Sequence, residues 1–117
     1  MAFVDDVVVA LEQGAHAGAA ALSIAGKDLT GDVERFVIPH LADIAIQIAS
    51  IVEKRASGIY TDVTAKNLLA SEKDAIEVMV ETVVTLIVLE VQNLVNAIWA
   101  AVASVVNSKI GFTLVSA

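Results

Sequence analysis

The sequence predicts an all-α protein, an elongated antiparallel bundle of three main helices that is completed by oligomerisation. Apolar residues recur every three or four positions through most of the 117-residue chain, which is the spacing of one helix face. The hydrophobic share is 57% and the mean hydropathy is +0.78, above the level of an ordinary globular domain. Much of this excess is Ala and Val, so we expect closely packed helices and burial of the remaining apolar surface between copies of the chain.

The longest stretch without Gly or Pro, 71–109, predicts one continuous C-terminal helix. Ser71 and Asp74 have the spacing of a capped helix start, and Lys109 and Gly111 mark the end. At about 1.5 Å per residue this helix is about 55 Å long, whereas a compact chain of this size has a radius of gyration of about 13 Å. The predicted helix is therefore too long for a monomeric globule.

The segment 3–25 predicts the first helix, because its apolar residues alternate between steps of four and three positions. Within it, Gly14 and Gly18 form a small-xxx-small pair that lets a neighbouring backbone come close. We predict that this pair lies at an oligomer interface, the alternative being a crowded helix crossing. The apolar seam comprises Val4, Val8, Leu11, Ala15, Gly18, Leu22 and Ala25.

The segment 33–56 predicts the second helix, with Asp32 as its N-cap. Pro39 falls inside the apolar pattern, so the helix is expected to start or kink near Ile38. A turn follows, and 62–70 is expected to form a short turn of helix before the long one begins.

The tail 110–117 is apolar and β-prone, and an exposed segment of this kind promotes aggregation. We expect it to dock, either on its own bundle or on a neighbouring subunit, and we predict Phe112 and Leu114 as interface residues. No domain boundary is visible, so 1–117 is expected to form a single helical domain.

Two further residues stand out on the predicted long helix. At about 100° per residue, Trp99 points the same way as Glu81 and Gln92, so we predict that it lies at an oligomer interface and not in the monomer core. Glu90 stands opposite Glu81, on the apolar seam. We predict that Glu90 is buried and paired and that it fixes the register of the bundle, the alternative being a seam edge open to water.

Charge and composition narrow the partners and the compartment. The net charge of −7 and the pI near 4.5 argue against binding to nucleic acid, which requires clusters of Lys and Arg. The absence of Cys rules out disulfides and thiolate metal sites. The first residues lack the basic and apolar regions of a secretory signal, so we do not expect export by that route; the cytoplasm is favoured and a membrane is the second choice.

The pattern of potential ligands and nucleophiles predicts no enzyme, no catalytic residue, no metal and no cofactor. Three pairs of potential metal ligands lie one helical turn apart, but the Glu-x-x-His of ferritin-like sites is absent. No glycine-rich phosphate loop, nucleophile elbow or His-Glu-x-x-His motif occurs. The three pairs are Glu12 with His16, His40 with Asp43, and Glu77 with Glu81.

A membrane span is the main competing interpretation. The stretch 83–106 carries a single charge, Glu90, and is long enough to cross a hydrocarbon core of about 30 Å. Polar residues recur near one of its faces, however, and basic flanking residues are scarce, so a soluble oligomer is favoured. The polar residues are Thr85, Gln92, Asn93 and Asn96.

The segment DVERFVIPHLA, residues 32–42, joins an Ala/Gly-rich first helix to a long Val-rich last one. In this arrangement the chain resembles small helical proteins encoded by bacteriophages and prophages, some of them virion components and some holin-like. The resemblance implies a structural or assembly role and assigns no role to any residue.

The first functional hypothesis is a self-associating structural or assembly protein with no catalytic activity, such as a phage virion component. Its partners would be further copies of the chain, together with another virion or cellular protein. One alternative is a small membrane-active, holin-type protein with 83–106 in the bilayer. The other is an acidic inhibitor module that binds a basic protein.

Overall fold

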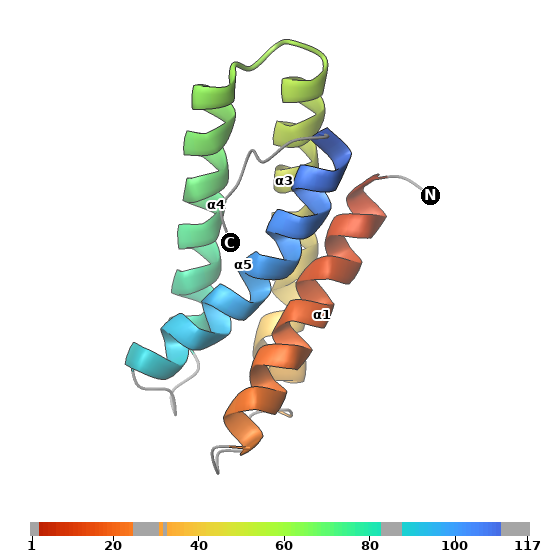
Figure 1. The fold of residues 1–117 in the computed structure, drawn as a ribbon. Coiled ribbons are helices and arrows are strands. Elements are labelled where there is room, and N and C mark those ends of the chain that lie inside the picture. Colours follow the sequence, from red (N-terminus) through yellow and green to blue (C-terminus); the bar gives the residue numbers. More distant parts are fainter. Residues whose placement is uncertain (1–2, 25–30, 32, 83–87, 111–117) are drawn as a thin grey trace.

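The computed structural model describes residues 3–24, 31, 33–82 and 88–110, and these residues are helical apart from short connections (Figure 1). The all-α prediction is therefore confirmed. Four α-helices and one short π-helix are described: α1 (Phe3–Ile24), η1 (Val33–Val37), α3 (Ile38–Ala56), α4 (Asp62–Glu81) and α5 (Val88–Ile110).

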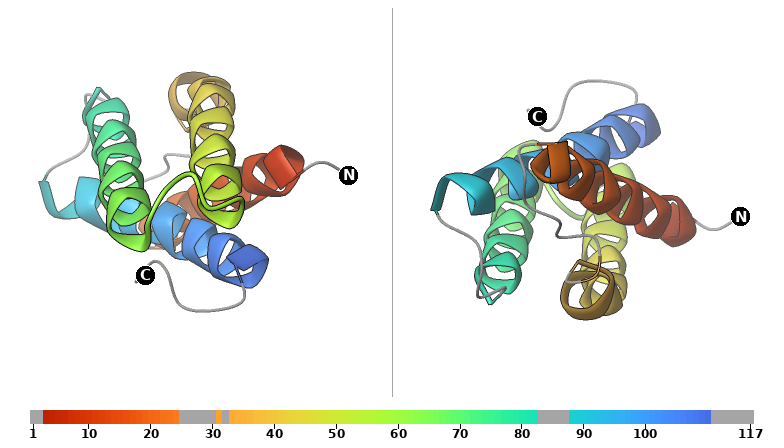
Figure 2. Two further views of the ribbon diagram at one scale, coloured as in Figure 1. Left: turned by 90° about the horizontal axis from the view of Figure 1, so that it is seen from above. Right: turned by 90° about the horizontal axis from the view of Figure 1, so that it is seen from below.

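The helices form two crossed layers. α3 and α4 make an antiparallel hairpin, and α1 and α5 run antiparallel to each other across it (Figures 1 and 2). The most extensive contact in the fold is between α1 and α5. The radius of gyration is 14.0 Å, close to the value of about 13 Å for a compact chain of this length. The fold thus closes within one chain.

The single helix predicted over 71–109 is wrong. α4 ends at Glu81, where the Thr82 hydroxyl donates a hydrogen bond of 2.6 Å to the carbonyl oxygen of Met79. The Thr82 amide donates to the same carbonyl at 3.2 Å, which tightens the last turn. A separate helix, α5, begins at Val88 and runs back across the hairpin (Figure 1).

The division of this stretch has a physical reason that the search for Gly and Pro misses. Residues 82–88 read TVVTLIV, and β-branched side chains lose rotamer freedom in a helix. The change of direction between α4 and α5 takes place between Glu81 and Val88. It allows the apolar sides of α4 and α5 to enter the same core, and each fully buried Val, Ile or Leu contributes about 1.5–3 kcal/mol.

The α3–α4 connection explains why α4 begins before the predicted cap at Ser71. Gly58, at φ +83°, ends α3 in a Schellman motif, in which the Ile59 amide donates to the Lys54 carbonyl at 2.9 Å. The Thr61 hydroxyl oxygen then accepts from the Thr64 amide at 3.2 Å and caps α4. The predicted short turn over 62–70 is therefore the first half of a continuous helix.

The first two predicted helices agree with the structure. The prediction of 3–25 matches α1, and 33–56 matches η1 followed by α3. Pro39 stands in the first turn of α3, directly after the π-helical turn, because proline has no amide hydrogen to continue the α-helical pattern backwards. α3 begins at Ile38, in agreement with the start or kink predicted near that residue.

The core is apolar throughout the described residues, with no buried polar or charged side chain among them. It is drawn from all four helices and from η1. The largest fully buried side chains are Leu11, Leu41, Ile48, Leu69, Ile76, Leu94 and Ile98.

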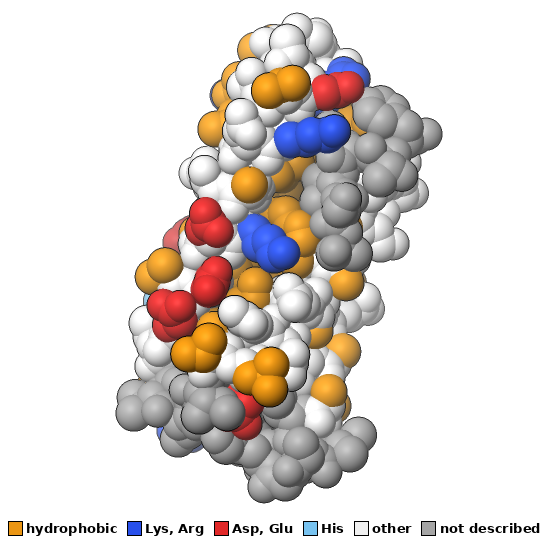
Figure 3. Space-filling view, turned by 60° about the vertical axis from the view of Figure 1, so that its left-hand side comes forward, with side chains coloured by type: hydrophobic (Ala, Val, Ile, Leu, Met, Phe, Trp, Pro, Cys, Tyr) orange, Lys and Arg blue, Asp and Glu red, His pale blue; other side chains and the backbone are white. Residues whose placement is uncertain are grey.

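The side of the molecule formed by α4 has an uneven distribution of charge. Lys and Arg side chains lie mainly in its upper half and Asp and Glu side chains mainly in its lower half (Figure 3). On α4 itself, Lys66 lies in the first half of the helix, whereas Asp74, Glu77 and Glu81 lie in the second. The upper end also carries Arg55, which forms an ion pair with Asp62 across the connection.

Candidate functional site

The glycine pair on α1 is used inside the chain. A Cβ atom added at Gly14 would lie 2.6 Å from the Ile98 Cα atom, and one added at Gly18 would lie 2.6 Å from the Leu94 Cδ1 atom and 3.1 Å from the Ala97 Cβ atom. Both glycines are buried where α1 crosses α5. The prediction that they lie between copies is wrong. The alternative, a crowded helix crossing, describes them.

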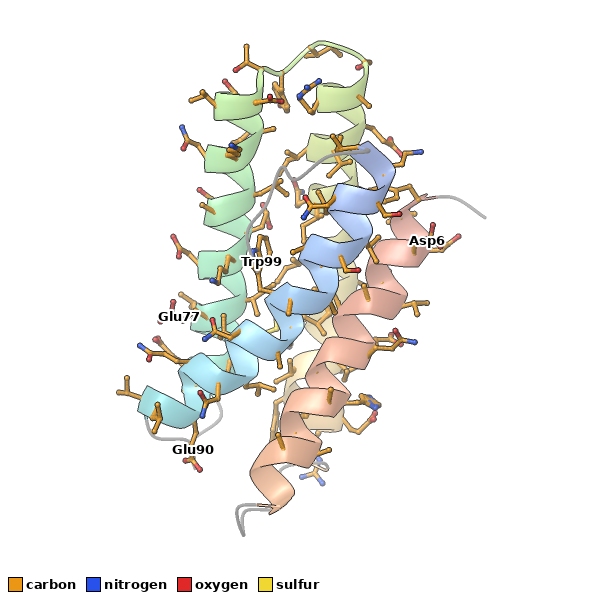
Figure 4. All side chains as sticks on the ribbon, in the orientation of Figure 1. Asp6, Glu77, Glu90 and Trp99 are labelled. Atoms are coloured by element: carbon orange, nitrogen blue, oxygen red, sulfur yellow. The ribbon has the colours of Figure 1, made fainter. Side chains whose placement is uncertain are left out.

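Trp99 lies in the monomer core, with 3% of its surface exposed, and the prediction of an exposed aromatic anchor is wrong. Figure 4 shows the side chain on the inner side of α5, towards the α3–α4 hairpin. The comparison with Glu81 fails because Glu81 belongs to a different helix, whereas Gln92 lies on α5 at nearly the same angle as Trp99 and is exposed. This side of α5 is therefore exposed near the start of the helix, at Gln92, and buried against the hairpin at Trp99.

Glu90 occupies the first turn of α5, at the lower end of the molecule (Figure 4). It is half-buried, so the predicted fully buried position on the apolar seam is wrong. The helix break again gives the reason, because it places the carboxylate near a helix N-terminus, where the helix dipole favours a negative charge.

The predicted site residues are not brought together. Gly14 and Gly18 lie at the α1–α5 crossing, Trp99 lies in the core, and Glu90 lies at one end of the molecule. Phe112 and Leu114, in the predicted tail, lie outside the described residues.

A groove of about 500 Å³ lies between the start of α1 and the end of α5. The Lys109 Nζ atom lies 5.4 Å from the centre of the Phe3 ring. Asp6, at the upper end of α1 in Figure 4, supplies an opposite charge. The described lining has two serines but no histidine to activate them. It comprises Phe3, Asp6, Val9, Ala10, Gln13, Ser104, Val105, Ser108 and Lys109.

A smaller hollow of about 150 Å³ lies between the end of α4 and the start of α5. Glu77 and Glu81 line it together with Val88 and Val91. Two carboxylates one helical turn apart could bind a cation weakly, but a protein metal site needs more ligands. Within the described part of the chain, no group of three His, Asp or Glu side chains is placed to hold a metal ion.

His16 pairs with a residue that the sequence spacing did not indicate. Its Nε2 atom lies 2.8 Å from the Oε1 atom of Glu34, and this contact links α1 to η1. Both side chains are about half exposed, so the pair contributes little to stability. Sequence spacing indicated Glu12, one turn away on the same helix, because a contact between helices leaves no local pattern.

The fold alters the titration of Glu72. It lies half-buried on α4, and burial raises the pKa of its carboxyl group above the ordinary value of 4.5. Glu72 lines neither of the two depressions described above, so it has no nucleophile or second carboxylate beside it there. Its raised pKa therefore does not mark a catalytic acid.

The exposed side of α4 combines large apolar side chains with both signs of charge. Val63 is 69% exposed and Val78 is 63% exposed. We call this surface the outer α4 face. It comprises Val63, Lys66, Asn67, Ala70, Ser71, Asp74 and Val78, all of them exposed.

Among the described residues, two helical segments are long and apolar enough to cross a membrane, Val33–Ala56 and Val88–Ile110. The assignment rests on length and composition only. In this fold the same two segments supply much of the core, and 44% and 39% of their most apolar windows are buried.

Comparison with known proteins gives no family for this chain. No protein-family model, curated protein or solved structure matches it. A functional interpretation therefore depends on the sequence, the fold and the surface.

Proposed function

We propose that this chain is a non-catalytic structural protein that works by assembling with further copies of itself. The observation that supports the proposal is the set of large apolar side chains on the surface of a closed, fully apolar core. They are Val9, Phe36, Ile46, Ile59, Val63, Val78, Val88 and Leu89, and they are 44% to 74% exposed.

Single exposed apolar residues are normal, but several on one surface favour a partner. Val78 stands near the end of α4, and Val88 and Leu89 open α5, so both sides of the α4–α5 junction expose apolar side chains. Covering one such side chain contributes about 1.5–3 kcal/mol, enough to favour association when several are covered together. The resemblance to phage-encoded helical proteins is consistent with a virion component.

The proposal is tested by measuring the mass of the purified chain by light scattering over a range of concentrations without detergent. We expect discrete species heavier than one chain, whose share rises with concentration. A single-chain mass at every concentration would contradict the proposal. Ser substitutions at the exposed apolar residues Val78, Val88 and Leu89 together provide a second measurement, since they should lower the mass without lowering the helix content.

The membrane-active alternative rests on the two long apolar helices. It predicts quantitative recovery in the membrane fraction and loss of the protein from detergent-free buffer. The same light-scattering experiment therefore separates the two hypotheses.

The acidic-inhibitor alternative rests on the hollow that contains Glu77 and Glu81. It predicts capture by a basic protein that weakens as salt rises, because binding driven by exposed charges is screened. Apolar self-association would be much less sensitive to salt.

A further inference from the structure

The outer α4 face is exposed, and the described helices pack against the other side of α4. α4 packs against the rest of the core with the side that carries Ala65, Leu69, Ile76 and Val80, all of them buried. The outer α4 face is on the opposite side of the helix and is exposed along its length. Its large apolar residues, Val63 and Val78, are near its two ends.

The order of residues on this face is symmetric about its centre. The centre is the small pair Ala70 and Ser71, which lets another helix approach closely. Val63 is seven positions before Ala70, and Val78 is seven positions after Ser71. A helix with this order matches a second copy that runs in the opposite direction, because the start of the face on one copy then meets the end of the face on the other.

We propose that two copies of the chain pair antiparallel through the outer α4 face, with a twofold axis beside Ala70 and Ser71. This inference rests on the proposed self-association and names its surface. In the pair, Val63 of each copy packs against Val78 of the other. The contact runs over about 22 Å of helix, which is short for a stable interface, so the dimer forms in a concentration-dependent way.

Charge complementarity supports the antiparallel direction. Lys66 is before the centre of the face, whereas Asp74 and Glu77 are after it. Antiparallel pairing brings Lys66 of each copy beside Asp74 and Glu77 of the other, whereas parallel pairing would place like charges side by side. The half of α4 after the centre also carries Lys73, which is half-buried.

Charge reversal of the full chain tests the proposal. Lys66→Glu and Asp74→Lys should each raise the dimer Kd, by about tenfold or more for Lys66→Glu, because two attractive pairs per dimer become repulsive. Mixing the two variants should restore dimerisation, since each variant then offers the charge that the other lacks. Asp43→Lys, an equal charge change on the exposed side of α3, is the matched control and should leave the Kd unchanged.

The direction of pairing is tested with single cysteines, since the chain contains none. Val63→Cys and Val78→Cys are mixed and treated with a short bifunctional thiol reagent. Antiparallel pairing predicts a crosslink between the two variants and little crosslinking of either variant with itself. Efficient crosslinking of Val63→Cys with itself would overturn the proposal.

The outcomes separate this inference from the proposed function. The parent chain could associate while Lys66→Glu leaves the dimer Kd unchanged and mixing Lys66→Glu with Asp74→Lys does not alter dimerisation. In that case the outer α4 face is not the interface, but the proposed self-association stands. If the parent chain remains monomeric at every concentration, both fail. Circular dichroism of each variant shows that the helices are intact.

Discussion

At the residue scale, the closest approach in the fold depends on Gly14. A methyl group there would meet the backbone of Ile98 at 2.6 Å, and backbone atoms cannot move aside cheaply. At Gly18 the nearest atom is the end of the Leu94 side chain, which can rotate. The absence of a Cβ atom at Gly14 thus sets how closely α1 and α5 pack.

We expect Gly14→Ala to destabilise the fold by about 1–3 kcal/mol, even though Ala is the better helix former. Gly18→Ala should cost less, and Gly31→Ala, with no atom within 4 Å of the added group, should be near neutral. Urea unfolding of the three variants measures the order. Equal stability of the Gly14 and Gly31 variants would show that the crossing is looser than described.

Glu72 makes stability depend on pH in a defined direction. Burial raises the pKa of its carboxyl group, so the ionised form is less favourable in the folded chain than in the unfolded one. Its contribution to stability is fully present below pH 4.5, where both states are protonated, and is lost as pH rises through the higher folded pKa.

Glu72→Gln should therefore raise the melting temperature at pH 7, because it removes the buried charge. Below pH 4.5 the variant and the parent should melt together. Glu53→Gln, at an exposed position on α3, is the control and should change little at either pH. A Glu72→Gln variant that melts lower than the parent at pH 7 would mean that the carboxylate makes a favourable contact.

At the element scale, the two possible starts of α4 can be told apart. Thr61→Ala removes the hydroxyl that accepts from the Thr64 amide and should cost about 1 kcal/mol. Ser71→Ala, at the start that the sequence predicts, should be neutral or slightly stabilising, because Ser71 is exposed inside a continuous helix. Unfolding at concentrations where the chain is monomeric gives both values. A larger loss of stability for Ser71→Ala than for Thr61→Ala would support the helix start predicted at Ser71.

The sequence is a good guide where local chemistry decides the structure. Pro39 and Gly58 mark a helix start and a helix end because their effects on the backbone act within a few residues. The break after Glu81 has no such marker. It depends on what α4 and α5 bury against the other helices, and that gain is not visible in a stretch read alone.

The candidate site was less predictable for the same reason. The spacing of Gly14 and Gly18 correctly indicates close helix packing, but spacing does not say whether the partner is the same chain. The angular positions of Trp99 and Glu90, which belong to α5, were compared with that of Glu81, which belongs to α4. The error in the extent of one helix therefore led to an error in the predicted position of two residues. The outer α4 face was missed because its residues fell partly before the predicted helix.

At the scale of the whole molecule, shape distinguishes the folded chain from one with a continuous C-terminal helix. The described residues measure 45 × 27 × 20 Å, whereas an unbroken helix over 71–109 would by itself be about 55 Å long. In dilute solution we expect X-ray scattering to give a longest dimension near 45 Å.

The same measurement at rising concentration tests how copies associate. α4 runs along the long axis of the molecule (Figure 1), so pairing through the outer α4 face adds the second copy at its side. The scattering mass should therefore double while the longest dimension increases only slightly, and the cross-section should widen. End-to-end association would nearly double the longest dimension, which would exclude the outer α4 face and direct attention to the apolar residues at the α4–α5 junction.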